Sequence, residues 1–219
     1  MHKEIAPFHY LTQDLPHYSH EEQVRVACEA GVKWVQLRVK KETFDEWLRI
    51  AQKVKAITSA FASTLIINDS VEIARLTDAE GVHLGQQDMP SYEARKILGN
   101  KKIVGVSIHS IEEFLRIKDS NIDYFGLGPF QFTGTKENLD AVLGLEGIKK
   151  VIMRIRAEGL RQPVVAIGGI CLEHVHQLLD AGADGVAVSS AINLSKNPQR
   201  MLRDFLKETE RVIHKYETL

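Results

Sequence analysis

Residues 163–192 read PVVAIGGICLEHVHQLLDAGADGVAVSSAI, and this stretch gives the strongest indication of the fold. It begins with a short apolar run at 163–169 and ends with another at 185–190. The segment between the two runs has helical character and stops at a glycine. Strands that are almost wholly apolar are typical of parallel sheets, which are buried on both faces. The stretch therefore predicts a strand–helix–strand unit with parallel strands.

The same alternation of strand and helix extends along the whole chain. Short apolar runs predict eight strands, at 8–14, 34–39, 64–69, 81–85, 103–107, 123–128, 163–169 and 185–190. Helical segments lie between them; one has Ser19 as its N-cap candidate, and another has Ser110 with Glu113 three residues later, a capping-box pattern. Eight strand–helix units of about 27 residues each predict an α/β fold, a (β/α)8 TIM barrel that covers residues 1–219 as a single domain. A doubly wound open sheet, which usually has fewer strands, is the structural alternative.

The composition excludes several classes of partner. The chain has 28 basic and 29 acidic residues, so no basic excess is present to neutralise a nucleic acid or a membrane surface. No apolar run approaches the roughly 18 residues of a membrane span, and the N-terminal MHKEIAPFHY lacks the apolar core of a signal peptide. Cys28 and Cys171 form no CxxC pair, so we expect reduced thiols and neither a disulfide framework nor a structural zinc site. These features favour a cytoplasmic protein.

Polar residues collect at the predicted strand ends, where a barrel places its active site. In the second strand, Gln36, Arg38 and Lys40 alternate with apolar residues, so all three should point to the same side. Because three polar side chains facing one way would be costly in a closed core, we expect them at the mouth of the barrel. A solvated edge strand is the alternative.

Two acidic residues follow the third and fourth strands. Asp69 comes directly after Asn68, and Asp88 lies in the segment Gln86-Gln87-Asp88. Neighbouring barrel strands would put the two carboxylates side by side, which suits Mg2+. The alternative is that Asp69 and Asp88 cap the helices that begin near Ser70 and Pro90. The spacing leaves both interpretations open.

Small residues end the last two strands, with Gly168-Gly169 after the seventh and Ser189-Ser190 at the end of the eighth. Each is followed by a helix start, and this is where TIM barrels often bind phosphate. Backbone N–H groups at a helix N-terminus bind an anion, and glycine permits its close approach. A pair of tight turns without a ligand is the alternative.

The loop from Pro129 to Leu143 is the longest segment without a predicted element. Loops of this length inside compact domains tend to be functional. It carries Thr133, Thr135 and Lys136, which would join the basic residues of the second strand in one anion site. Two anion sites and a metal in one pocket suggest a reaction that joins or splits two phosphorylated molecules.

Six segments within residues 34–192 carry a family resemblance: VQLRVK, LIINDSVEIARLTDAEGVHLGQQDMP, VGVSIHS, DYFGLGPFQFTGTK, PVVAIGGI and AGADGVAVSSAI. Together and in this order they resemble the thiamine-phosphate synthase family, also called thiamine-phosphate pyrophosphorylase. The resemblance implies a (β/α)8 barrel that couples two small phosphorylated substrates with the help of Mg2+. These are hydroxymethylpyrimidine pyrophosphate and hydroxyethylthiazole phosphate, and the products are thiamine phosphate and pyrophosphate.

The resemblance also implies a role for each matching position. The residues implied to bind the pyrimidine pyrophosphate are Gln36, Arg38, Lys40, Asn68, Ser107 and Lys136. Those implied to bind the thiazole phosphate are Thr133, Thr135, Gly168, Ser189 and Ser190. Asp69 and Asp88 would hold Mg2+, while Arg38, Ser107 and Lys136 would act in catalysis. The implied mechanism is dissociative: pyrophosphate leaves, and the thiazole nitrogen attacks the resulting pyrimidine methylene cation.

The sequence departs from the family pattern in places, and two alternative functions remain open. The first strand is a loose match, the lead into Thr133 is longer and less apolar than usual, and we interpret His83 as structural or pocket-lining. A thiazole tautomerase of the same superfamily would use His109 as its acid–base group. A non-catalytic phosphate-binding barrel is a second rival. The sequence leaves open whether the chain forms a homo-oligomer, and whether the helical tail at 196–219 packs on its own barrel or on a partner.

Overall fold

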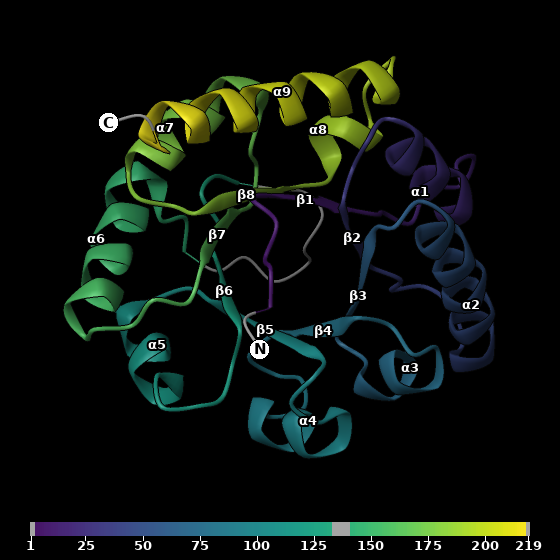
Figure 1. The fold of residues 1–219 in the computed structure, drawn as a ribbon, viewed down its shortest axis with the longest axis horizontal. Coiled ribbons are helices and arrows are strands. Elements are labelled where there is room, and N and C mark those ends of the chain that lie inside the picture. The colour runs from purple at the N-terminus through teal and green to yellow at the C-terminus, as the bar shows by residue number, and fades with distance from the viewer. Residues whose placement is uncertain (1–2, 133–140, 218–219) are drawn as a thin grey trace.

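A computed structural model describes residues 3–132 and 141–217 of the chain. Its eight strands are parallel and close into a barrel in sequence order, with β8 paired to β1. Helices form an outer ring around the strands (Figure 1). The predicted (β/α)8 barrel is therefore confirmed, and the open sheet is wrong.

The strands are β1 Phe8–Leu11, β2 Trp34–Leu37, β3 Thr64–Asn68, β4 Gly81–Leu84, β5 Ile103–Ile108, β6 Tyr124–Leu127, β7 Val164–Ile167 and β8 Gly185–Val188. The helices are α1 His20–Glu29, α2 Phe44–Ala60, α3 Val71–Leu76, α4 Ser91–Leu98, α5 Ile111–Ile117, α6 Gly144–Ala157, η1 Leu172–His174, α7 Val175–Asp180, α8 Ser190–Asn193 and α9 Pro198–Glu217. Within the described ranges, none of these helices has the length and apolar character needed to cross a membrane. Cys28 and Cys171 are free cysteines.

The predicted helix starts hold with one correction. Ser19 caps α1, and its side chain accepts a hydrogen bond from the Glu22 backbone N–H. Ser110 likewise caps α5 by accepting from the Glu113 N–H. The Glu113 carboxylate, however, accepts from the backbone N–H of His109 at 2.8 Å. The second bond of the predicted capping box is therefore displaced by one residue.

Strand residues alternate between the helix layer and the barrel interior. On β1, Phe8 and Tyr10 belong to the core between strands and helices. Leu11 packs instead inside the barrel, in an interior cluster of Leu11, Trp34, Ile66, Ile103, Tyr124, Val165 and Ala187. This alternation has a functional consequence, because each inward-facing side chain near a strand's carboxyl end can reach the mouth of the barrel.

The helical tail packs on its own barrel. Leu202, Phe205 and Val212 of α9 belong to the same core as β1. The Phe205 ring stacks on Phe8 of β1 with centroids 5.8 Å apart. The last helix thus covers the first strand.

Candidate active site

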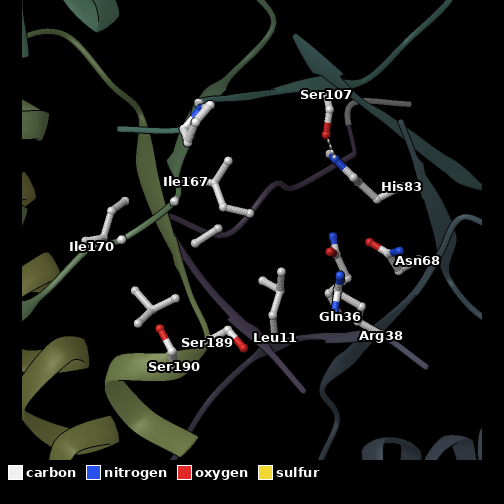
Figure 2. Close-up of a pocket in the computed structure, with 16 residues that line it drawn as sticks. Leu11, Gln36, Arg38, Asn68, His83, Ser107, Ile167, Ile170, Ser189 and Ser190 are labelled. Atoms are coloured by element: carbon white, nitrogen blue, oxygen red, sulfur yellow. Dashed lines mark hydrogen bonds between the residues drawn. The ribbon is translucent and has the colours of Figure 1, made fainter. Parts of the chain in front are cut away.

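A cavity lies at the carboxyl ends of the strands, as expected for a barrel (Figure 2). Seven of the predicted site residues line it: Gln36, Arg38, Asn68, Ser107, Gly168, Ser189 and Ser190. The other lining residues are Leu11, His83, Gly128, Pro129, Ile167, Gly169, Ile170, Ala187 and Val188. Thr133, Thr135 and Lys136 lie outside the described residues, so their placement stays a prediction.

The cavity has two chemically different sides. Figure 2 shows Gln36, Arg38 and Asn68 grouped together on one side, with His83 and Ser107 nearby. On the other side lie Ile170, Ser189 and Ser190. Amides, a guanidinium, an imidazole and a hydroxyl thus face a wall built from small and apolar residues. Two different ligand parts can be held opposite each other in such a cavity.

His83 connects the polar side to the interior of the barrel. Its Nε2 lies 2.9 Å from the Ser107 hydroxyl, and its Nδ1 lies 2.8 Å from the Tyr124 hydroxyl. His83 lines the cavity, so the interpretation of it as a pocket-lining residue holds. The link from Ser107 to Tyr124 was not anticipated from the sequence.

The end of β2 is held by two side chains that follow β1. The Arg38 backbone N–H donates to the Thr12 hydroxyl at 3.0 Å, and the Lys40 N–H donates to the Asp14 carboxylate at 3.1 Å. The Lys40 ammonium forms an ion pair with Asp69. The edge-strand alternative is wrong, because β2 pairs with both β1 and β3. Gln36 and Arg38 face the cavity, whereas Lys40 lies beside the acidic pair and is not among the lining residues.

The two acidic residues do not cap helices. Ser70, not Asp69, caps α3 through a hydrogen bond from the Ile73 N–H, and Pro90 precedes α4 without a side-chain cap. The helix-cap interpretation of Asp69 and Asp88 is therefore wrong.

The backbone at Asp69 is left-handed, with φ +67°, and its N–H donates to the His83 carbonyl at 2.7 Å. A non-glycine residue in this region carries strain that is often found at functional sites.

Asp69 and Asp88 lie close enough to interact. Burial is the main cause that raises the pKa of the Asp88 carboxyl, and the neighbouring Asp69 carboxylate raises this pKa further. The Gly85 N–H opposes the shift by donating to Asp88 at 2.6 Å. Among the described residues, no group of three or more His, Cys, Asp or Glu side chains is placed to hold a metal. A cation here would have two carboxylates and would need further ligands from water or substrate.

Glycines shape the opposite side of the cavity. Gly168 has φ +98°, and a Cβ at this position would lie 2.7 Å from Pro129 Cα. The Phe130 N–H donates to the Ile167 carbonyl at 2.8 Å, and the Gln131 N–H donates to the Gly168 carbonyl at 3.0 Å. The loop after β6 is thus packed backbone against backbone on the loop after β7. Only glycine suits both this approach and this backbone conformation.

His109, the acid–base group of the tautomerase alternative, is placed differently from the cavity residues. Its Nδ1 lies 2.9 Å from the Glu113 carboxylate. It is not among the described residues that line the cavity. The acid–base group that a tautomerase would need is therefore not part of the cavity wall among the described residues.

A closed parallel barrel with a polar cavity at its carboxyl end defines a TIM-barrel enzyme. The chain belongs to the thiamine monophosphate synthase family, whose sequence model matches residues 10–192. This assignment confirms the family expected from the sequence motifs and makes the protein a transferase, a thiamine-phosphate synthase by function.

Relatives agree with this assignment. A thiamine-phosphate synthase from Bacteroides fragilis is 38% identical over 205 residues, covering 94% of this chain and 97% of the relative. One from Flavobacterium psychrophilum is 43% identical over 185 residues, covering 84% and 90% of the two chains. The structure of a thiamine phosphate pyrophosphorylase from Pyrococcus furiosus superposes with a TM-score of 0.83 at 32% identity, covering 94% and 97%.

Proposed function

We propose that the protein couples hydroxymethylpyrimidine pyrophosphate with hydroxyethylthiazole phosphate in the cytoplasm, giving thiamine phosphate and pyrophosphate. The observation that carries this proposal is the two-sided cavity, which combines a polar side with a glycine- and serine-lined side. The polar side would take the pyrimidine and its pyrophosphate. The other side would take the thiazole phosphate at Gly168, Ser189 and Ser190.

The buried amides suit an aminopyrimidine. Gln36 and Asn68 are only 3% and 8% exposed, and both line the cavity. Each amide offers a donor and an acceptor, which match a ring nitrogen beside an amino group. Arg38 would hold the pyrophosphate, and Ser107 would donate a hydroxyl hydrogen bond to it. Lys136 would add a second positive charge from the loop after β6.

Asp69 and Asp88 are the residues that would hold Mg2+. They fit it because one carboxyl has a raised pKa that a nearby cation would lower, and because Mg2+ commonly takes one or two carboxylates together with substrate phosphates. The ion would supply charge neutralisation for the departing pyrophosphate. Lys40 already places a cation against Asp69, so it would balance the charge of this pair.

The proposed reaction needs little proton transfer. The C–O bond to pyrophosphate breaks first, and the leaving group takes both electrons. The lone pair of the thiazole nitrogen then forms the C–N bond to the pyrimidine methylene carbon. Because this nitrogen carries no proton, no general base is required. The residues around the cavity would contribute by orientation and by fixed charge, with Arg38, Ser107 and Lys136 against the leaving group.

The direct test is incubation of the purified protein with both substrates and Mg2+. Thiamine phosphate and pyrophosphate should appear in equal amounts, and omission of either substrate should abolish both products. Isomerisation of a thiazole carboxylate phosphate without any thiamine phosphate would instead support the tautomerase and overturn the proposal. Binding of both substrates without turnover would support the non-catalytic barrel.

A further inference from the structure

Tyr124, the first residue of β6, lies inside the barrel directly below the cavity residues. Its side chain is 1% exposed, and it belongs to the interior cluster and not to the cavity lining. Its ring meets the rings of Trp34 and His9 edge-on, at centroid distances of 5.6 and 5.3 Å. These contacts fix the ring, so the direction of its hydroxyl is fixed as well.

The Tyr124 hydroxyl connects three strands of the polar side. It lies 2.8 Å from His83 Nδ1 on β4, and the Gln36 side chain on β2 lies near it. His83 Nε2 in turn lies 2.9 Å from the Ser107 hydroxyl on β5. A neutral imidazole donates from one nitrogen and accepts at the other. The direction of the hydrogen bond between Tyr124 and His83 therefore determines the direction of the one between His83 and Ser107.

The barrel leaves room for this chain at two inward-facing glycines. A Cβ at Gly105 would overlap the Tyr124 ring. A Cβ at Gly126 would lie 2.8 Å from His83 Cε1. Glycine inside a strand lowers strand stability, and it often marks a close approach by another group. Gly105 thus leaves space for the Tyr124 ring and Gly126 for the His83 ring, and these two side chains are hydrogen-bonded to each other.

The environment favours orientation over proton transfer. Burial raises the pKa of the Tyr124 hydroxyl far above its ordinary value. The group therefore stays a neutral hydroxyl at any working pH. It can donate and accept hydrogen bonds, but it is no source of protons for a reaction.

We propose that Tyr124 is a positioning residue whose hydroxyl orients the Gln36 amide and, through His83, the Ser107 hydroxyl toward the pyrimidine pyrophosphate. This inference rests on the proposed function, because it assumes which substrate meets these two side chains. If Tyr124 merely fills the core, removing its oxygen affects stability alone. If it positions the polar side, removing its oxygen weakens one substrate selectively.

The test compares Tyr124→Phe with Thr209→Val. Both substitutions remove one buried hydroxyl, but that of Thr209 bonds the Phe205 carbonyl within α9. For Tyr124→Phe we expect the dissociation constant of the pyrimidine pyrophosphate, measured by calorimetry without thiazole, to rise about tenfold, the equivalent of one lost hydrogen bond. The KM of the thiazole phosphate should stay within about twofold of the parent. Thr209→Val should match the parent in both measurements.

Gly126→Ala provides an independent variant, because its methyl group would displace His83 without touching the tyrosine ring. It should show the same selective loss, and unchanged binding in this variant counts against the positioning role even if Tyr124→Phe does not fold. Unchanged pyrimidine binding in a folded Tyr124→Phe or Gly126→Ala variant overturns the positioning role. Absence of coupling by the parent protein, in contrast, would overturn the proposed function itself.

Discussion

The contact between the loops after β6 and β7 can be tested by comparing two glycines with nearly the same positive φ. Gly168 has φ +98° and Gly31 has φ +101°, so alanine is strained at both positions. At Gly168 the new methyl would lie 2.7 Å from Pro129 Cα, whereas at Gly31 its nearest neighbour is Leu206 Cδ1 at 3.9 Å, an ordinary contact. The pair therefore separates the effect of close packing from that of backbone strain.

We expect Gly31→Ala to lower the free energy of unfolding by about 1–2 kcal/mol, the cost of a left-handed alanine. Gly168→Ala should cost about 1–3 kcal/mol more, because the backbone of Pro129 has to move to relieve the overlap. Urea denaturation of both variants measures the difference. Gly168→Ala should also lose coupling activity while still folded, since Gly168 lines the cavity. Equal losses of stability in the two variants would refute the idea that the two loops are packed backbone to backbone.

Two further predictions concern charge. Asp69→Asn and Asp88→Asn should raise the Mg2+ concentration needed for half-maximal coupling by about tenfold or more. Asp78→Asn is the control, because Asp78 is a surface residue that also has a left-handed backbone and a lysine partner, and it should leave this concentration unchanged. Unchanged Mg2+ titrations in both site variants would contradict the metal assignment. Burial, followed by the nearby His83, lowers the pKa of His9 to about 3. In the unfolded chain His9 binds a proton as pH falls below about 6.5, whereas in the folded chain it stays neutral down to about pH 3. His9 should therefore lower the free energy of unfolding by about 1.4 kcal/mol for each pH unit in this range. Between pH 7 and pH 5, the free energy of unfolding should fall less in His9→Gln than in His17→Gln, the matched change at an exposed histidine. An equal fall in the two variants would contradict the buried state of His9.

The fold was predictable because its signal is repeated. Eight apolar runs alternate with helical segments, and each predicted strand has its counterpart in the barrel. Parallel strands buried on both faces leave few polar residues, so the exceptions stand out. Gln36, Arg38 and Asn68 were such exceptions, and all three line the cavity.

The parts of the site that were missed depend on register and on exact turn geometry. Thr12 and Asp14 hold the backbone N–H groups of Arg38 and Lys40, but this requires knowing which residues of β1 and β2 face each other. The alternation of Thr12 and Asp14 at the end of the first predicted strand was the available signal. The helix-cap interpretation of Asp69 failed because the left-handed turn at this residue starts α3 one residue later.

The hydrogen-bonded chain below the cavity was beyond sequence reasoning for a different reason. Tyr124 and His83 both lie in apolar runs, where a polar ring is as easily interpreted as part of the core. Their contact arises only when β4, β5 and β6 are placed side by side. Gly105 and Gly126 were the traces of it in the sequence, since each leaves space for one of the two rings.

The stacking of Phe205 on Phe8 has a consequence for biosynthesis. The barrel closes between β1 and β8, and α9 covers β1, so β1 is synthesised well before the two elements that pack against it. Until both have emerged, β1 has an unpaired edge and an uncovered apolar face, which are features that invite aggregation. A nascent chain that stops short of residue 198 would lack α9 and would leave this surface exposed.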